Sequence, residues 1–252
     1  MMLLRPFLND ATSCASYLFG CTSHGTLAVV DPHADLVDRY LASADAVGHP
    51  IVAVFETHLQ ADHVSGLPEL VERTGATAYL PAGAGVEFAH HPLDDGALVK
   101  LGNTRVRAIA TPGHAPAHHA YAVSDLRRGT ADPWLVFTGD SLLIGDVGRP
   151  DLHVSGDPHG QARILHESLS RLLEMPDGVV VLPSHYGGSV CGRGLSSNPI
   201  SSIGFERAHN EMLAYADADS FAEALVKDTP EPPPGQAQIV AANRRGAAGA
   251  PA

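Results

Sequence analysis

The most informative stretch of the sequence is IVAVFETHLQADH, from Ile51 to His63. Its first five residues are apolar and mostly β-branched, which is typical of a strand buried on both faces. Two histidines, an amide and a carboxylate then crowd into the six residues that follow Thr57. Imidazole and carboxylate groups this close together converge on one cation if the loop curls back. The stretch therefore predicts a metal site at the end of a buried strand.

Three more expected strands end in residues of the same kind. The segment TPGH ends in His114, TGD ends in Asp140, and PSH ends in His185. Four strand ends thus supply the pattern HxxxDH, H, D, H. Because a single loop histidine is often merely solvated, it is the recurrence at four strand ends that favours a metal centre.

The composition narrows the class of protein. Lys and Arg number 16 against 28 Asp and Glu, a formal net charge of −12, so nucleic acid is not an expected partner. No apolar run approaches the roughly 18 residues that a membrane span needs, so no membrane association is expected. The three cysteines, Cys14, Cys21 and Cys191, are too few for a disulfide framework. With no signal-peptide pattern at the start of the sequence, they predict a reducing, cytoplasmic location.

Strands and helices are expected in both halves of the chain, which predicts an α/β (α+β) fold of four layers. Strands are expected at residues 16–20, 26–31, 51–55, 76–80, 98–101, 105–110, 119–123, 134–138 and 179–182. Helices are expected at residues 36–47, 67–73, 205–215 and 221–227, and after the N-cap and proline pair Asp157-Pro158. From Thr229 the chain is rich in Pro, Gly and Ala and is expected to form an extended tail or linker. We therefore expect a catalytic domain over residues 1–228 and a C-terminal extension over residues 229–252.

Taken together, these motifs resemble those of the metallo-β-lactamase superfamily, whose loops read THxHxDH, GH, GD and a late H. The resemblance runs from about Ala11 to Asp228. It implies an αββα sandwich with the metal at one edge of the two sheets. The matching residues are His58, Asp62, His63, His114, Asp140 and His185.

Gln60 departs from that signature, because it stands where the family has its second histidine. In zinc hydrolases such as glyoxalase II, that histidine helps to complete the first metal site. An amide oxygen is a weak ligand compared with imidazole. The remaining set, two histidines and one aspartate, is the facial triad of non-haem Fe(II) oxygenases. The persulfide dioxygenases of the superfamily resemble glyoxalase II but bind one iron through the counterparts of His58, His114 and Asp140.

Three other segments are similar to persulfide dioxygenases, in particular to members fused to rhodanese domains. They are GDVGRPDL at 145–152, GSVCG at 188–192 and NPISSIGFER at 198–207. A rhodanese domain would begin near Asn243, so this chain is expected to lack one, which leaves open whether a separate rhodanese delivers the sulfur. Dimers are common in that branch, so the resemblance also favours a homodimer.

The resemblance implies the ligand set of the metal. His58, His114 and Asp140 are expected to hold one Fe(II) per chain, with zinc as the alternative. Four residues are expected either to orient ligands and water from just outside that set or, in a hydrolase, to build a second metal site: Gln60, Asp62, His63 and His185. For Gln60, the expectation is either a hydrogen bond with iron-bound water or a neutral replacement at a position that is not a ligand.

Substrate contacts are expected from loop residues near these motifs. Arg149 and Arg193 are expected to bind substrate carboxylates, although Asp151 beside Arg149 offers a structural ion pair instead. Tyr186 is expected to hydrogen-bond the thiol carrier, and Cys191 to lie near the site or to be a small buried residue. Of His118 and His119, at most one faces the site, because neighbours on a strand point to opposite faces. The other histidines, among them His153, carry no predicted function.

The expected function is oxidation of glutathione persulfide, or a similar low-molecular-weight persulfide, with O₂ to sulfite and free thiol. Two alternatives stay open. One is a zinc thioester hydrolase of the glyoxalase II type, which Asp62, His63 and His185 support. The other is a metal-binding partner of a separate rhodanese that has lost turnover. Metal analysis separates the dioxygenase from the hydrolase, because the dioxygenase needs iron and the hydrolase needs zinc.

Overall fold

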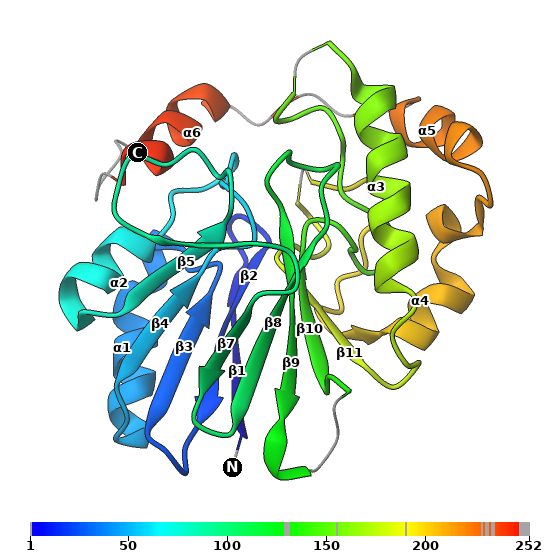
Figure 1. The fold of residues 1–252 in the computed structure, drawn as a ribbon. Helices are drawn as coiled ribbons and strands as arrows, with labels where there is room; N and C mark the ends of the chain where they lie inside the picture. Colours follow the sequence, from blue (N-terminus) through cyan, green and yellow to red (C-terminus); the bar gives the residue numbers. More distant parts are fainter. Residues whose placement is uncertain are drawn as a thin grey trace.

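Two six-stranded sheets pack face to face between outer layers of helices in the computed structural model (Figure 1). The structure describes residues 2–128, 132–154, 156–189, 191–227, 229, 232 and 235–246. The αββα architecture predicted from the sequence is confirmed. No helix among these residues has the length and apolar character needed to cross a membrane.

The first sheet has the strand order β1-β2-β3-β4-β5-β6. Its strands are β1 (Met2–Asn9), β2 (Cys14–Cys21), β3 (Thr26–Val30), β4 (Ile51–Phe55), β5 (Thr77–Pro81) and β6 (His91–Leu93). The first three strands run antiparallel, whereas β3 to β6 run parallel. Helices α1 (Val37–Val47) and α2 (Leu67–Thr74) cover its outer face.

The second sheet has the order β12-β11-β10-β9-β8-β7. Its strands are β7 (Leu98–Leu101), β8 (Thr104–Ala110), β9 (His119–Asp125), β10 (Leu135–Gly139), β11 (Val180–Pro183) and β12 (Ser201–Ser202). Only the β10–β11 pair is parallel. The outer face of this second sheet is covered by α3 (Pro158–Leu172), α4 (Ile203–His209) and α5 (Ala218–Val226).

Aromatic side chains fill the space between the sheets. The Phe137 ring of β10 lies 4.9 Å from that of Phe19 and 5.1 Å from that of Tyr17, both on β2. Phe55 of β4 lies 5.2 Å from Tyr121 of β9. These contacts between strands of opposite sheets fix one sheet against the other, so the loops at the strand ends have a rigid base.

The helices begin and end where the sequence provides caps. Asp157 accepts a hydrogen bond from the Gly160 amide, and Pro158 occupies the first turn of α3, as predicted. Leu165, Leu169 and Leu172 are buried along the face of α3 that packs on the second sheet. Asp157 therefore fixes where the long loop after β10 ends.

Several elements differ from the sequence expectation. Strands β1, β6 and β12 were not expected, and the helix expected over 205–215 is two pieces. Helix α4 ends before Asn210, whose extended backbone and side-chain bond to the Met212 amide begin a new 3₁₀ turn, η3 (Glu211–Ala214). Two further 3₁₀ turns are η1 (Ala34–Leu36) and η2 (Leu126–Arg128).

The expectation of an extended tail is wrong for residues 236–245, which form helix α6 (Gln236–Arg245). The helix is held by a polar contact. The Asn243 amide nitrogen donates to the backbone oxygens of Gln60, at 3.0 Å, and His63, at 2.9 Å. Its amide oxygen accepts from the Ser65 amide at 2.9 Å. The domain boundary expected at residue 228 lies outside the described residues and stays a prediction.

Candidate metal centre

Loops that follow four strands meet at one edge of the sandwich. His58 follows β4, His114 lies between β8 and β9, Asp140 follows β10, and His185 follows β11. The His114 Nε2 atom is 3.5 Å from Asp140 Oδ2, and the His58 and His114 ring centroids are 4.9 Å apart. His185 Nδ1 lies 2.6 Å from Asp140 Oδ1. The structure therefore brings together the residues that the four motifs supply.

His58 and His114 are held by their outward-facing ring nitrogens. The His58 Nδ1 atom is 2.9 Å from the Thr57 hydroxyl, and His114 Nδ1 donates to the backbone oxygen of Arg149 at 2.9 Å. Each ring keeps Nε2 for the interior of the site. Burial lowers the pKa of both imidazoles, so they stay neutral, which is the form that binds metal.

Asp140 has one carboxylate oxygen in use and one without a partner. Its Oδ1 is bound to His185, whereas its Oδ2 is buried and has no hydrogen-bond partner among the described residues. Although burial opposes it, the interactions with His185 above all, and with His114 and His58, hold the pKa of Asp140 well below its usual range. A buried, unpaired carboxylate oxygen facing neutral imidazoles is costly without a cation, so these donors fit a metal ion.

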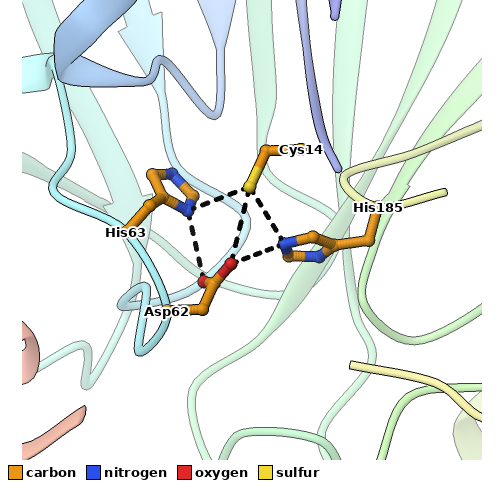
Figure 2. Close-up of side chains that lie close together, drawn as sticks. All are labelled: Cys14, Asp62, His63 and His185. Atoms are coloured by element: carbon orange, nitrogen blue, oxygen red, sulfur yellow. Dashed lines mark hydrogen bonds and ion pairs between the residues drawn. The ribbon is translucent and has the colours of Figure 1, made fainter. Parts of the chain in front are cut away.

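A second cluster lies beside the first and is drawn in Figure 2. Cys14 Sγ is 3.4 Å from His185 Nε2, 3.5 Å from Asp62 Oδ2 and 3.7 Å from His63 Nδ1. His185 Nε2 is also 2.7 Å from Asp62 Oδ2. His185 therefore connects Asp62 to Asp140, and this chain of hydrogen bonds orients the Asp140 carboxylate.

Charge is concentrated in this second cluster. Burial alone would raise the pKa of Asp62, yet His185 and His63 hold it well below its usual range. Burial would likewise lower the pKa of His185, but Asp140, Cys191 and Asp62 raise it well above its usual value. The arrangement can therefore act either as a network of charge-assisted hydrogen bonds or, after losing protons, as a set of donors for a second cation.

The amide nitrogen of Gln60 is bonded to two buried carboxyl groups. It donates to Asp31 Oδ1 at 3.3 Å and to Glu56 Oε2 at 3.2 Å. Burial and the charge of Asp31 raise the pKa of Glu56 to about 8. Both contacts of the amide nitrogen thus go to buried carboxyl groups, whereas the amide oxygen has no hydrogen-bond partner among the described residues, so a hydrogen bond with iron-bound water stays a prediction.

The expected substrate-binding arginines both have partners within the fold. Arg149 is buried and makes two bonds to Asp151, of 2.8 and 2.7 Å, so the ion-pair alternative holds for it. Arg193 donates to the Ala224 backbone oxygen at 2.9 Å and lies 3.3 Å from Met212 Sδ. These contacts direct Arg193 toward α5 and η3.

Tyr186 and Cys191 lie near the second cluster. The Tyr186 hydroxyl donates to Asp10 at 2.8 Å, and burial together with Asp10 raises its pKa to about 12. Cys191 Sγ is 4.0 Å from His185 Nε2, and burial raises the pKa of this thiol to about 12. Cys191 is thus a neutral, buried thiol beside His185.

Three further residues of the site lie outside the four motifs. Cys14 begins β2 and reaches the site from a strand that contributes no motif. His118 accepts a hydrogen bond from the Asp140 amide at 3.1 Å and stacks on His58, as the alternation with His119 allowed. His153 lies against His58 and His114. His118 was one of two candidates in the sequence, whereas Cys14 and His153 were missed.

Gly148 lets the loop after Asp140 pass directly over the site. A Cβ atom at this position would be 1.7 Å from the Asp140 backbone oxygen and 3.1 Å from His114 Nδ1. We expect Gly148→Ala to lower stability by about 1–3 kcal/mol and to weaken metal binding, because Asp140 must shift. Gly178→Ala is the matched control, since its Cβ would meet nothing within 4 Å. Equal melting temperatures and equal metal contents in the two variants would contradict this expectation.

The sequence profile of the Metallo-beta-lactamase superfamily matches residues 9–185, well over half of the chain. The chain therefore belongs to the metallo-beta-lactamase superfamily, whose members bind metal ions. Among its relatives, a hydroxyacylglutathione hydrolase of Polaromonas sp. is 30% identical over 188 residues, which are 73% of this chain and 66% of that protein. The mitochondrial persulfide dioxygenase ETHE1 of Bos taurus is 24% identical over 237 residues, 92% of this chain and 84% of that protein.

Solved structures agree with the fold. A metallo-beta-lactamase from Staphylococcus aureus superposes with a TM-score of 0.91 at 29% identity and covers 98% of this chain and 73% of its own. ETHE1 from Myxococcus xanthus superposes with a TM-score of 0.82 at 29% identity and covers 96% of this chain and 98% of its own. These relatives include both a hydrolase and a dioxygenase, so the reaction has to be argued from the site.

Proposed function

We propose that the protein is an Fe(II)-dependent persulfide dioxygenase that acts on glutathione persulfide or a similar low-molecular-weight persulfide. The observation that carries this is the combination of His58, His114 and Asp140 with a Gln60 side chain that is bonded to Asp31 and Glu56. Two imidazoles and a carboxylate with open positions suit O₂ chemistry at iron. The alignment with a persulfide dioxygenase over 92% of the chain supports the same reading.

The reaction converts RSS⁻, O₂ and H₂O into RSH and HSO₃⁻. Both atoms of O₂ go to the terminal sulfur, and water supplies the third oxygen and cleaves the S–S bond. Iron, when bound, would supply the redox chemistry that joins O₂ to sulfur.

The protein groups around the three donors fix their positions and protonation. Thr57 and the Arg149 backbone oxygen set the orientation of the two imidazoles. His185 holds one oxygen of Asp140, which leaves the other for the metal. Because all three donor side chains are nearly inaccessible to bulk water, their geometry changes little when substrate arrives.

A zinc-dependent thioester hydrolase is the second candidate function. The cluster of Cys14, Asp62, His63 and His185 favours it, because these donors lie within 4.8 Å of one another and suit a second cation. The 30% identity to a hydroxyacylglutathione hydrolase also supports it. Against it stands Gln60, which removes an imidazole from the first site of the dinuclear arrangement.

An oxygen electrode and a sulfite assay test the proposal. Iron-loaded protein given glutathione persulfide in air is expected to take up one O₂ per persulfide and to release sulfite and glutathione in equal amounts. His58→Ala, which removes one donor, is the inactive control. Fully iron-loaded protein that takes up no O₂, while the zinc-loaded form rapidly hydrolyses lactoylglutathione, would transfer the assignment to the hydrolase.

A further inference from the structure

A third imidazole faces the metal centre from a segment outside the family motifs. His153 follows Arg149 and Asp151 in the loop between β10 and α3. Its ring centroid is 5.2 Å from that of His114 and 5.7 Å from that of His58. One ring nitrogen from each of the three histidines lies within 4.8 Å of the other two.

Within the described part of the chain, one nitrogen of the His153 ring is left without a hydrogen bond. Its Nε2 atom is buried and has no hydrogen-bond partner among the described residues. The outward nitrogens of His58 and His114 are already bonded to Thr57 and Arg149. Buried ring nitrogens are normally hydrogen-bonded, and three imidazoles facing one another cannot satisfy each other unless a proton or a cation lies between them.

The loop that carries His153 is attached at two points, to His114 and to helix α6. The Arg149 backbone oxygen accepts the bond from His114, and its guanidinium group pairs with Asp151. The Leu152 side chain is buried, and its backbone oxygen accepts from Gln236 at the start of α6. His153 is therefore positioned by the residues just before it, which attach to a metal-site histidine and to the C-terminal helix.

We propose that His153 is a ligand of the metal, so that the donor set is His58, His114, His153 and Asp140. It would restore the number of imidazoles that Gln60 removes, from a different part of the chain. A six-coordinate ion would keep two open positions, enough for one sulfur and one O₂. The inference concerns the site of the proposed function but rests only on metal binding there, so it holds for iron, zinc or cobalt.

Cobalt(II) binding to the metal-free protein tests this ligand without using activity. His153→Ala and His153→Phe are each expected to bind Co(II) at least about tenfold more weakly than the unaltered protein. The phenylalanine variant keeps a ring of similar size, so it guards against simple collapse of the loop. His159→Ala is the matched control, because this exposed histidine of α3 lies six residues further along and is expected to leave the affinity unchanged.

X-ray absorption of the Co(II)-loaded proteins counts the imidazole ligands. We expect three in the unaltered protein and in His159→Ala, and two in both His153 variants. The inference fails if folded His153 variants keep the same affinity and the same count. The ligand assignment and the proposed function can fail separately. If the protein takes up no O₂ but the His153 variants lose one imidazole, the ligand assignment is supported and only the dioxygenase proposal is rejected.

Discussion

Asp140→Ala is expected to lose its iron and at least about a hundredfold of its O₂ uptake with persulfide. Asp140 offers the only carboxylate oxygen among the described residues that is buried without a hydrogen-bond partner. Its removal also leaves His185 without one of its two carboxylate partners. Iron content after gel filtration, measured by mass spectrometry, and an oxygen electrode trace report the two losses.

Gln60→Ala is the contrasting variant. It is expected to keep its iron, because the amide is bonded to Asp31 and Glu56 and not to the metal. Losing those two hydrogen bonds should cost about 1–3 kcal/mol of stability, seen as a lower melting temperature. If Gln60→Ala lost as much iron as Asp140→Ala, the assignment of Gln60 outside the ligand set would be rejected.

Exchanging iron for zinc is the second change with a large expected effect. The iron form, at one metal per chain, should consume O₂ with persulfide, whereas the zinc form should consume none, because Zn²⁺ has no redox chemistry. Metal analysis of each form, before and after chelation and reloading, ties the activity to the ion. Active protein that holds two zinc ions at full occupancy would overturn the dioxygenase proposal.

The parts of the site that the sequence made predictable are those that follow buried strands. His58, His114, Asp140 and His185 each come directly after an apolar run or a tight turn, and strand ends of two packed sheets meet at one edge. The direction of the Gln60 side chain could not be predicted, because Asp31 follows a different strand, β3. Cys14 was missed for the same reason: it contacts His185 across 171 positions of sequence.

Helix α6 escaped prediction because it has no apolar period to detect. Ala242 and Asn243 are its buried residues, and the second of these is polar. Gly235 and Gly246 mark the ends of the helix, but glycine is also common in extended segments. In the same way, the break at Asn210 depends on a side-chain bond to Met212, which an apolar pattern does not encode. Elements held by side-chain hydrogen bonds were therefore harder to predict than those held by apolar packing.

The bonds of Asn243 to the loop that carries His58 and His63 affect where a tag or a fused domain can be attached. A purification tag or a fused domain attached just after Gly246 would begin three residues from the amide that secures the loop of His58 and His63. Truncating the chain before Gln236 would remove that amide and the Gln236 bond to Leu152 together. Affinity handles are therefore better placed at the other terminus, on strand β1 at the edge of the first sheet.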